Sequence, residues 1–375
     1  MVSTRFVYAD AYLGRTDAFE ISPDLPLASA DGTTEGLPGA VGDAAPDRWG
    51  RSLIKKRLMS DGRVGHGRPR TVTEVDFLLG VSDLTRHGAL RYRLGGSEFL
   101  APGHAVPKLL ELPRLLHAAD AATAEGGDDH AAVQELLDAG SASLGGARPK
   151  ASVRDGDRLF IAKFPHRGDE WDVMAWEKSV LDLAERCGIR SSPRRLVQVA
   201  GRSVLLVQRF DRVGDVRRPY VSAMALLGSR DGVSRDYLEI AEAIGDHGSN
   251  VVADLEELWR RIAFSVAVNN TDDHLRNHGF VRQGAGWTLS PVFDVNPNPD
   301  AAASRVTSIS YAASRGDATM AVANAARYFG LTSDRAAAIW AEIRAVVSGW
   351  RQTARSNGIA ESEMRRFAPV LDQSS

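Results

Sequence analysis

The spacing of apolar residues divides the chain into a first part with short strands and helices and a second part that is mainly helical. Alternating apolar and polar residues predict strands, and apolar residues three or four positions apart predict helices. On this basis we expect strands at 5–8, 18–21, 88–92, 151–154, 158–165, 195–199 and 203–208, and helices at 52–59, 73–79, 107–117, 131–137 and 176–187. From Asp236 onward the pattern is helical apart from one hairpin. The sequence therefore predicts a mixed α and β protein with a helical second half.

A polar loop at 269–278 interrupts this helical part. The segment before it, 255–266, carries apolar residues at helical spacing, and two asparagines end that pattern. The segment after it, 279–293, has two apolar runs separated by a Gly-Ala-Gly turn, which predicts a β-hairpin. We therefore expect the loop between a buried helix and a hairpin that ends at Asp294.

Three oxygen-bearing side chains in and after this loop suit phosphoryl transfer. Asp272 and Asn277 stand five positions apart, and Asp294 follows at the predicted strand end. In kinases one carboxylate accepts the proton of the attacking hydroxyl, while an amide oxygen and a second carboxylate hold Mg²⁺ against the nucleotide phosphates. Because aspartate and asparagine are also common capping residues of turns, this spacing alone leaves a purely structural role open.

A small-residue loop at 141–150 and two charged residues after it offer groups for nucleotide binding. Gly145 and Gly146 would let the backbone approach a phosphate closely, although such a pair is also common in ordinary turns. Lys163 lies within an otherwise apolar strand, where a lysine needs a partner, and Glu177 follows on the next predicted helix. A strand lysine paired with a helix glutamate positions phosphates in kinases, and it is equally the pattern of an interior ion pair.

Composition narrows the class of protein further. The chain has 375 residues, enough for two or three domains, and 43% of them are apolar, enough for a large core. With 46 basic and 48 acidic residues the formal charge is -2, which argues against a dedicated nucleic-acid-binding protein. A local segment at 48–70 is basic, as in a surface for an acidic partner or nucleic acid, or in a solvated helix face.

The sequence also bears on the expected location. The single cysteine, Cys187, excludes an intrachain disulfide and fits a reducing compartment. No apolar run approaches the roughly 20 residues of a membrane helix. Residues 1–14 have neither the apolar core nor the cleavage pattern of a secretory signal. We therefore expect a cytoplasmic protein without membrane association.

Taken in order, the motifs of the chain resemble those of the HipA family of bacterial serine/threonine kinases, the toxins of toxin–antitoxin pairs. The matching motifs are Gly-Gly-Ala-x-Pro-Lys at 145–150, Ala-Lys-Phe-Pro at 162–165, the helix glutamate, Gln-Arg-Phe-Asp-Arg at 208–212, Thr-Asp-Asp-His-Leu-Arg-Asn at 271–277 and Ser-Pro-Val-Phe-Asp-Val at 290–295. The resemblance is strong over 141–299, weaker at 46–51 and 78–83, and limited to the helical pattern near the carboxyl end.

This resemblance implies an α+β, protein-kinase-like fold with two lobes, preceded by an N-terminal α/β subdomain. The implied parts are 1–100 as that subdomain, 101–140 as a helical connection, 141–210 as a small β-rich lobe and 211–375 as a larger helical lobe with the catalytic loop.

It also implies a role for each matching residue. Asp272 would be the catalytic aspartate, assisted by Lys163 and Asn277, and Mg²⁺ would be held by Asn277 and Asp294. Lys163 would pair with Glu177, and the adenine of ATP would lie in the hinge. The implied ATP-binding residues are Gly145, Gly146, Ala147, Lys150, Lys163, Glu177, Gln208, Phe210 and His274.

Some positions depart from the family pattern. Ala142 aligns with a regulatory serine whose phosphorylation silences the kinase, and its neighbours Ser141 and Ser143 are the candidate autophosphorylation positions. Asp273 and Arg276 stand where a glycine and a lysine are frequent, and neither change removes a required group.

The resemblance implies partners as well. The expected partner is a small DNA-binding, HipB-like antitoxin, with DNA reached only through that complex and the basic segment 48–70 near the DNA. The expected activity is that of an ATP- and Mg²⁺-dependent serine/threonine protein kinase, a toxin acting on a translation-related protein. Two alternatives are open: a small-molecule phosphotransferase of the kinase-like class, or an inactive kinase fold that serves as a binding module for a partner or a DNA complex.

Overall fold

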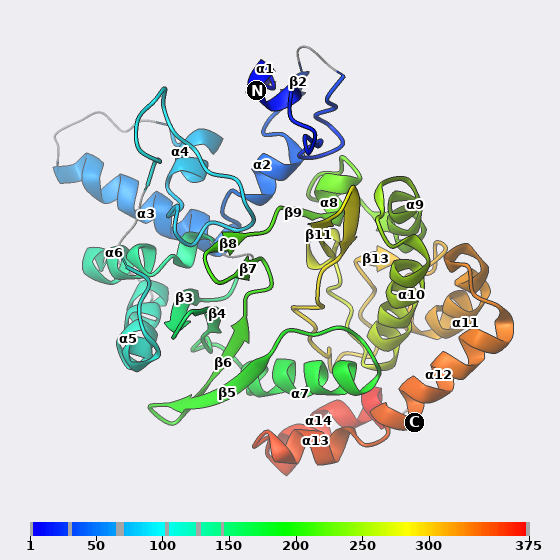
Figure 1. The fold of residues 1–375 in the computed structure, drawn as a ribbon. Helices are drawn as coiled ribbons and strands as arrows, with labels where there is room; N and C mark the ends of the chain where they lie inside the picture. The colour runs from blue at the N-terminus through cyan, green and yellow to red at the C-terminus, as the bar shows by residue number, and fades with distance from the viewer. Residues whose placement is uncertain are drawn as a thin grey trace. The chain divides into compact units, whose positions relative to one another are not determined.

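The computed structural model describes residues 3–28, 32–64, 71–101, 105–124, 129–143 and 146–372. The chain forms two compact units. The first comprises Met1–Glu170 and Pro193–Tyr220, and the second comprises Trp171–Ser192 and Val221–Ser375. Helix α7 (Val173–Arg186) therefore belongs to the second unit, although strands of the first unit flank it in the sequence (Figure 1).

The first unit is built on a four-stranded antiparallel sheet in the order β3-β4-β6-β5. The elements of this unit, with η for 3₁₀ helices, are β1 (Ser3–Phe6), α1 (Asp10–Leu13), β2 (Gly32–Glu35), α2 (Gly39–Asp43), α3 (Arg48–Val64), α4 (Glu74–Leu79), η1 (Leu109–Glu111), α5 (Leu112–Thr123), α6 (His130–Asp138), η2 (Ser141–Ser143), β3 (Lys150–Asp155), β4 (Arg158–Lys163), β5 (Arg194–Val199), β6 (Arg202–Gln208), β7 (Arg212–Val213) and β8 (Val216–Arg217). The four sheet strands and helices α4 and α6 lie within a few residues of their predicted positions, whereas α5 begins and ends five to six residues later than the helix predicted at 107–117.

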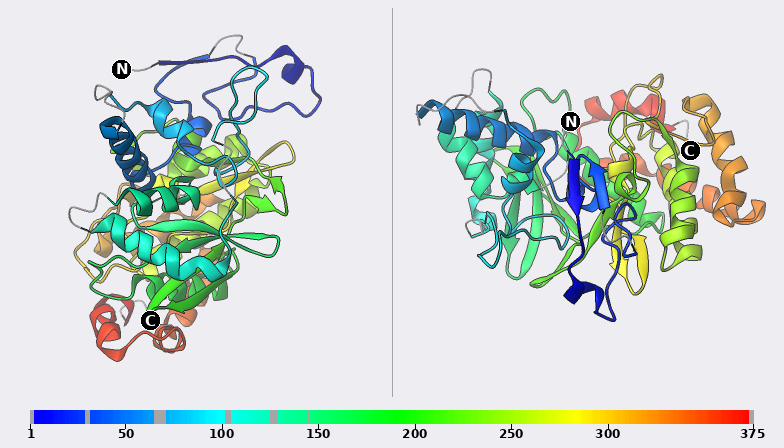
Figure 2. Two further views of the ribbon diagram at one scale, coloured as in Figure 1. Left: turned by 90° about the vertical axis from the view of Figure 1, so that its left-hand side faces the viewer. Right: turned by 90° about the horizontal axis from the view of Figure 1, so that it is seen from above.

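Helices α3, α5 and α6 share one hydrophobic core with this sheet (Figures 1 and 2). Residues at helical spacing supply the contacts, among them Leu53 of α3, Leu115 of α5 and Leu136 of α6, all essentially without solvent exposure. From the sheet side Val153 and Leu206 complete the same cluster. The segment predicted as a helical connection thus forms a layer of the core in this unit.

Two strands predicted in the first hundred residues do not form. At 18–21 the backbone amides of Phe19 and Ile21 donate to the hydroxyls of Tyr12 and Tyr8, and not to a neighbouring strand. At 88–92 the amide of Gly88 donates to the Asp211 carboxylate at 2.9 Å, and Gly88 itself has a φ of 70°. The amides of Phe19, Ile21 and Gly88 are thus paired with side chains and not with a neighbouring strand.

The second unit is mainly helical and contains one small sheet in the order β12-β11-β9. Its elements are α7, β9 (Tyr220–Ser222, at the boundary), α8 (Ala223–Leu226), β10 (Arg235–Asp236), α9 (Tyr237–His247), α10 (Val251–Ala267), η3 (Leu275–Asn277), β11 (Gly279–Gln283), β12 (Gly286–Leu289), β13 (Thr307–Ser308), α11 (Arg315–Ala325), η4 (Ala326–Phe329), α12 (Ser333–Val347), α13 (Trp350–Ser356) and α14 (Glu361–Leu371). Helix α10 packs against α9, α11 and α12, and its Leu258, Trp259 and Ile262 are buried.

The predicted hairpin is present but shorter than expected. Strands β11 and β12 pair from Phe280↔Leu289 to Gln283↔Gly286. Asp294 therefore lies beyond the hairpin in an irregular segment, not at a strand end as predicted, and it adopts a left-handed φ of 58°. In the part of the chain that the structure describes, no helix has the length and apolar character needed to cross a membrane.

Candidate active site

The loop at 269–278 begins where helix α10 ends, and an asparagine with left-handed backbone makes the turn. Asn269 has a φ of 53°, a conformation that asparagine tolerates better than most residues. Its Nδ2 donates to the carbonyls of Asn298 at 2.6 Å and Asp300 at 3.1 Å. The Asn298 side chain in turn donates to Thr271 Oγ1 at 2.8 Å. The polar residues that end the apolar pattern thus tie the loop to the segment that follows Asp294.

Asp273 holds the middle of the loop in place. Its carboxylate accepts the Tyr237 hydroxyl at 2.5 Å and lies 3.1 Å from His278 Nε2. Burial alone would raise the pKa of Asp273, but His278, Tyr237 and Arg305 outweigh it and hold the pKa at about 2. The same Arg305 donates to the carbonyl of Asn270 at 3.0 Å. Asp273, noted in the sequence only as a departure from a family pattern, is therefore the buried anchor of the loop.

Asp272, its neighbour, has the opposite surroundings. Its side chain reaches the surface, but the protein around it removes part of its hydration, and this raises its pKa. Repulsion from Asp294 and Asp273 raises the pKa further, and His274 has an opposing effect. A carboxylate with a raised pKa is a better proton acceptor than an ordinary aspartate. The two adjacent aspartates therefore differ in burial and in the direction of their pKa shifts.

Asn277 and Asp294 are the two predicted Mg²⁺ ligands, and their coordination of Mg²⁺ stays a prediction. Asn277 is buried, and its Nδ2 donates to the Asp272 carbonyl at 3.2 Å, so the amide oxygen is the end directed elsewhere. Asp294 and Asp272 repel each other, and a bound cation would reduce this repulsion. Among the described residues no group of three or more His, Cys, Asp or Glu side chains is placed to hold a metal. Mg²⁺ does not need one, because water and phosphate oxygens complete its coordination.

The first unit brings two predicted phosphate-binding lysines together. Lys150 on β3 stands directly opposite Lys163 on β4, so both side chains project from one face of the sheet. Lys150 is the buried one, and Lys163 is half-buried at the last position of its strand, less enclosed than predicted. Like charges opposite each other are unfavourable, so this pair suits a ligand that carries several negative charges.

Part of the glycine-rich loop can be described beside these lysines. Gly146 has a φ of 97°, and a Cβ at this position would lie 2.7 Å from Lys150 Nζ, so glycine leaves room for the lysine. The Gly146 amide donates to the Asp47 carboxylate, and Ala147 is exposed. Gly145 lies outside the described residues.

The predicted hinge residues follow strand β6. Gln208 ends the strand, and Phe210 lies between Arg209 and Asp211, a buried pair joined at 2.6 Å. The Phe210 ring is 6.0 Å from the ring of His87. Burial lowers the pKa of His87 to about 4, despite the opposing charge of Asp211, so the imidazole is neutral at pH 7. The buried pair therefore fixes the backbone on both sides of Phe210.

Other predicted positions lie apart from these groups or in different surroundings. Glu177 is buried in α7 of the second unit, whereas Lys163 belongs to the first, and their pairing stays a prediction. Ser141 and Ser143 are buried, and Ser143 Oγ donates to the Gly140 carbonyl at 2.6 Å. In the basic segment Arg51 pairs with Glu74, while the segment beyond residue 64 lies outside the description.

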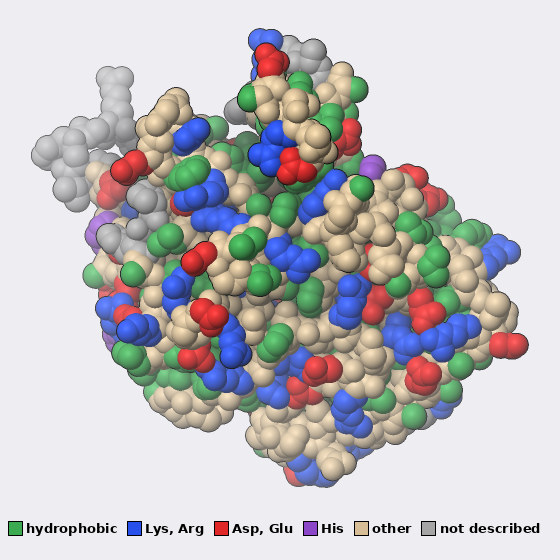
Figure 3. Space-filling model, in the orientation of Figure 1, with side chains coloured by type: hydrophobic (Ala, Val, Ile, Leu, Met, Phe, Trp, Pro, Cys, Tyr) green, Lys and Arg blue, Asp and Glu red, His purple; other side chains and the backbone are tan. Residues whose placement is uncertain are grey.

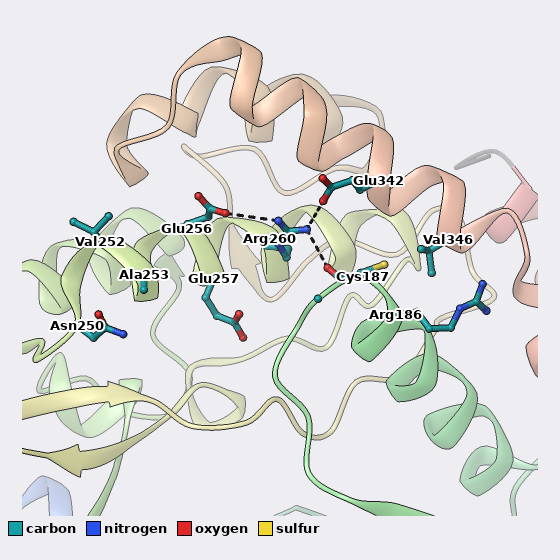
Figure 4. A pocket seen from close by; sticks show the side chains of 11 residues that line it. Arg186, Cys187, Asn250, Val252, Ala253, Glu256, Glu257, Arg260, Glu342 and Val346 are labelled. Carbon is teal, nitrogen blue, oxygen red and sulfur yellow. Dashed lines mark hydrogen bonds and ion pairs between the residues drawn. The ribbon is translucent and has the colours of Figure 1, made fainter.

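A separate cavity of about 980 Å³ lies between α7, α10 and α12, and none of the predicted site residues lines it (Figure 4). Its central Arg260 donates to Glu342 at 2.8 Å and to the Cys187 carbonyl at 3.0 Å. Burial raises the pKa of the Cys187 thiol to about 12, so this cysteine is not a nucleophile at neutral pH. The cavity has charges that are already paired and no reactive group.

Two family models match the chain. The HipA-like C-terminal domain matches residues 142–350, and the HipA N-terminal domain matches residues 2–90. The chain belongs to the HipA family. The resemblance deduced from its motifs is thereby confirmed. A search of curated proteins gives no match.

The solved structure of one HipA supports the fold of this HipA-family protein. HipA in the complex of HipA, HipB and operator DNA from Shewanella oneidensis MR-1 is 16% identical, with a TM-score of 0.71, over 98% of this chain and 89% of that one. The proinflammatory kinase CtkA of Helicobacter pylori gives a TM-score of 0.40 and 12% identity over 60% of this chain and 92% of that one. The predicted fold class, α+β and kinase-like in the manner of HipA, is confirmed.

Proposed function

We propose that this HipA-family protein is an ATP- and Mg²⁺-dependent serine/threonine protein kinase that acts as the toxin of a toxin–antitoxin pair. The observation that carries the proposal is the pair Asp272 and Asp273, of which one is fixed by buried partners and the other is open with a raised pKa. Asn277, whose Nδ2 donates to the Asp272 carbonyl, and Asp294, whose charge raises the pKa of Asp272, carry the oxygen donor types that Mg²⁺ prefers. An inactive binding module has no need of this arrangement.

Each residue of the candidate site has a proposed role in phosphoryl transfer. The Asp272 carboxylate accepts a hydrogen bond from the acceptor hydroxyl and takes its proton as the oxygen attacks the γ-phosphorus. Lys150 and Lys163 bind phosphate oxygens, and the predicted glycine-rich loop with Gly145, Gly146 and Ala147 would bring backbone amides close to them. Mg²⁺ on Asn277 and Asp294 would neutralise the charge of the transferred group. Glu177 would orient Lys163, Gln208 and Phe210 would contact the adenine, and His274 would help to shape the ATP site.

The partner and substrate are proposed from the same family membership. The related Shewanella HipA is found with HipB and operator DNA. This chain would accordingly bind a small, HipB-like DNA-binding antitoxin and reach DNA only through that complex, with a translation-related protein as its phosphorylated substrate. Basic and acidic side chains are intermingled on the face drawn in Figure 3, and the formal charge of the whole chain is -2.

Intact-mass spectrometry tests the proposed activity. Full-length protein is incubated with ATP and Mg²⁺, alone and with a bacterial protein extract treated to inactivate its own kinases, beside Asp272→Asn and the exposed control Asp215→Asn. Wild type and Asp215→Asn should transfer phosphate to serine or threonine, and Asp272→Asn should lose about 10²–10⁴-fold in rate, as expected for loss of a general base.

The opposing outcomes are distinct. Phosphate on a sugar or antibiotic but on no protein would replace the proposal by a small-molecule phosphotransferase. Failure of calorimetry to detect ATP–Mg²⁺ binding would leave the inactive binding module. Peptide mapping decides between Ser141 and Ser143, and because both are buried, their modification requires local opening of the η2 turn.

A further inference from the structure

A small cavity in the second unit adjoins the candidate catalytic loop. It has a volume of about 390 Å³ and is lined by residues of 230–235, by His274–Arg276 and by 305–307. His274 follows Asp272 by two residues, and its backbone amide donates to the Asp272 carbonyl at 3.1 Å. Any polypeptide that presents a hydroxyl to Asp272 must therefore place neighbouring residues near this cavity.

The charged lining is predominantly basic. Its charged members are Arg230, Asp231, Arg235, Arg276 and Arg305. Arg235 is committed to Glu239 at 2.7 Å, and Arg305 to backbone carbonyls of the loop. Arg276 pairs with Asp231 at 2.9 Å, with the two side chains 36% and 76% exposed. A pair so open to solvent contributes little stability, so a competing carboxylate can replace Asp231.

Two buried atoms of the lining are also unsatisfied. Within the described residues His274 Nδ1 and Arg305 Nε have no hydrogen-bond partner. Buried polar atoms in folded proteins are nearly always paired, and a bound water or ligand can supply such a partner.

The segment behind the cavity ends in a strained turn. The Val306 amide donates to the Thr271 carbonyl at 3.0 Å, and the Thr307 hydroxyl donates to the Asp273 carbonyl at 2.6 Å. Both hydrogen bonds attach this segment to the candidate catalytic loop. The chain then reverses in a two-residue hairpin at Ser310 and Tyr311, with φ values of 48° and 69° that normally require glycine or asparagine.

The strained turn is held by a carboxylate and presents an aromatic side chain. Asp236 accepts the amides of Ser310 at 3.1 Å and Tyr311 at 2.8 Å. Tyr311 is 92% exposed. Backbone strain of this kind persists where the surrounding structure imposes it, and it is concentrated at functional sites. A rigidly held, exposed tyrosine is also a common contact residue of protein interfaces.

We infer that the cavity and Tyr311 form the docking surface for the protein substrate, with the cavity taking an acidic side chain close to the acceptor serine or threonine. The inference rests on the proposed kinase function and adds a substrate class to it. Arg276 and Arg230 bind the acidic side chain, and Tyr311 contacts the substrate backbone or an apolar residue farther along.

Matched peptides test the acidic preference. A library of 15-residue serine peptides, in which each flanking position carries Glu or Gln in turn, is given to the full-length protein with ATP and Mg²⁺. At one flanking position the kcat/KM ratio of Glu to Gln should be about five or more, the size of one partly exposed ionic contact. Arg276→Gln and Arg230→Gln should bring this ratio towards one, whereas Arg365→Gln, the same charge change at an exposed position of α14, should not.

Binding of the same labelled peptides, measured by fluorescence anisotropy without ATP, separates the two proposals. Acid-preferring binding that depends on Arg276 and Arg230 would support the docking surface even if no phosphate were transferred, and that result would sink only the kinase function. Phosphorylation with no acidic preference, or with a preference that survives both arginine changes, would overturn the docking surface and leave the kinase standing.

The contribution of Tyr311 has its own readout. Tyr311→Ala should raise the KM for the best library peptide about fivefold and leave the KM for ATP unchanged, as expected for loss of one interface contact. Tyr311→Phe should keep the KM for this peptide close to the wild-type value. Equal peptide KM values in wild type and Tyr311→Ala would remove Tyr311 from the docking surface.

Discussion

At the scale of single residues, two adjacent aspartates divide the duties of structure and chemistry. Asp273 is buried among Tyr237, His278 and Arg305, whereas Asp272 is exposed and repelled by Asp294. The motif in the sequence pointed to Asp272, but it could not distinguish the two environments. The groups that surround Asp273 come from α9, from η3 and its flank and from the segment before β13, and only the fold brings them together.

Asp273→Asn should lower the free energy of unfolding at pH 7, and the difference from wild type should disappear in acid. The pKa of Asp273 in the fold is about 2, below its ordinary 3.8, so the ionised group stabilises the fold above pH 4 by about 2 kcal/mol. This contribution is lost as the pH falls from about 4 to about 2. Urea unfolding of both proteins across this range measures it, and a difference that stays constant with pH would contradict the assignment.

The raised pKa of Asp272 also has a checkable cause. Asp294→Asn removes one repelling charge and should lower the pKa of Asp272, measured by NMR titration of the side-chain carboxyl carbon in the absence of Mg²⁺. Asp300→Asn, a nearby change outside the groups that shift Asp272, is the control. Equal titration of Asp272 in all three proteins would show that Asp294 does not contribute to its raised pKa.

At the scale of elements, the apolar periodicity of the sequence predicted the helices and strands that form from it. Strands β3 to β6, helices α7 and α10 and the hairpin after the loop all appear near their predicted positions, because each has its own apolar periodicity. The strand expected at 88–92 failed for a non-local reason. Gly88 is bonded to Asp211, more than a hundred residues away in sequence, and no periodicity reports such a contact.

The turn at Ser310 and Tyr311 gives a prediction about strain. Tyr311→Gly should raise the free energy of unfolding by about 1 kcal/mol, because glycine adopts a φ of 69° without steric cost. Tyr311→Ala keeps the Cβ and so the strain, and with a side chain 92% exposed it should change stability little. Thermal unfolding of the two variants compares them directly, and equal stability would mean that the turn is relaxed.

The contact between α3 and the η2 turn gives a prediction about packing. A Cβ on Gly50 would lie 2.7 Å from Pro46 Cβ and 2.8 Å from the Ala142 backbone, so Gly50→Ala should destabilise the protein by about 1–3 kcal/mol. Gly42→Ala on α2 meets nothing within 4 Å and should be neutral or slightly stabilising. Melting temperatures of the two alanine variants make the comparison, and equal values would show that the η2 turn yields without cost.

At the scale of the whole molecule, each of the two units is formed by two separate stretches of the chain, and the sequence does not reveal this division. Helix α7 leaves between β4 and β5 to join the second unit, and helices from the first 140 residues complete the core over the sheet. The lysines Lys150 and Lys163 were found separately in the sequence, and only the register of β3 with β4 sets them opposite each other.

The two units should respond to acid in different pH ranges. In the first unit His87 has a pKa of about 4, below its ordinary 6.5, because burial favours the neutral ring. The unfolded chain then binds a proton that the fold excludes, so stability falls as the pH drops from 6.5 to 4, by at most about 3 kcal/mol for a side chain 24% exposed. In the second unit Asp273 loses its contribution only below about pH 4.

Hydrogen exchange read by mass spectrometry can follow both units in one sample. Amides of β3, β4 and β6 should lose protection between pH 6.5 and 4, after correction for the intrinsic exchange rate, while those of α9 and α10 keep theirs until the pH falls further. His87→Gln should remove the upper pH dependence, and His117→Gln, an exposed histidine of the same unit, should leave it intact. If both units lost protection together and His87→Gln made no difference, the acid response would belong to the molecule as one cooperative body, and burial of His87 would carry no stability cost.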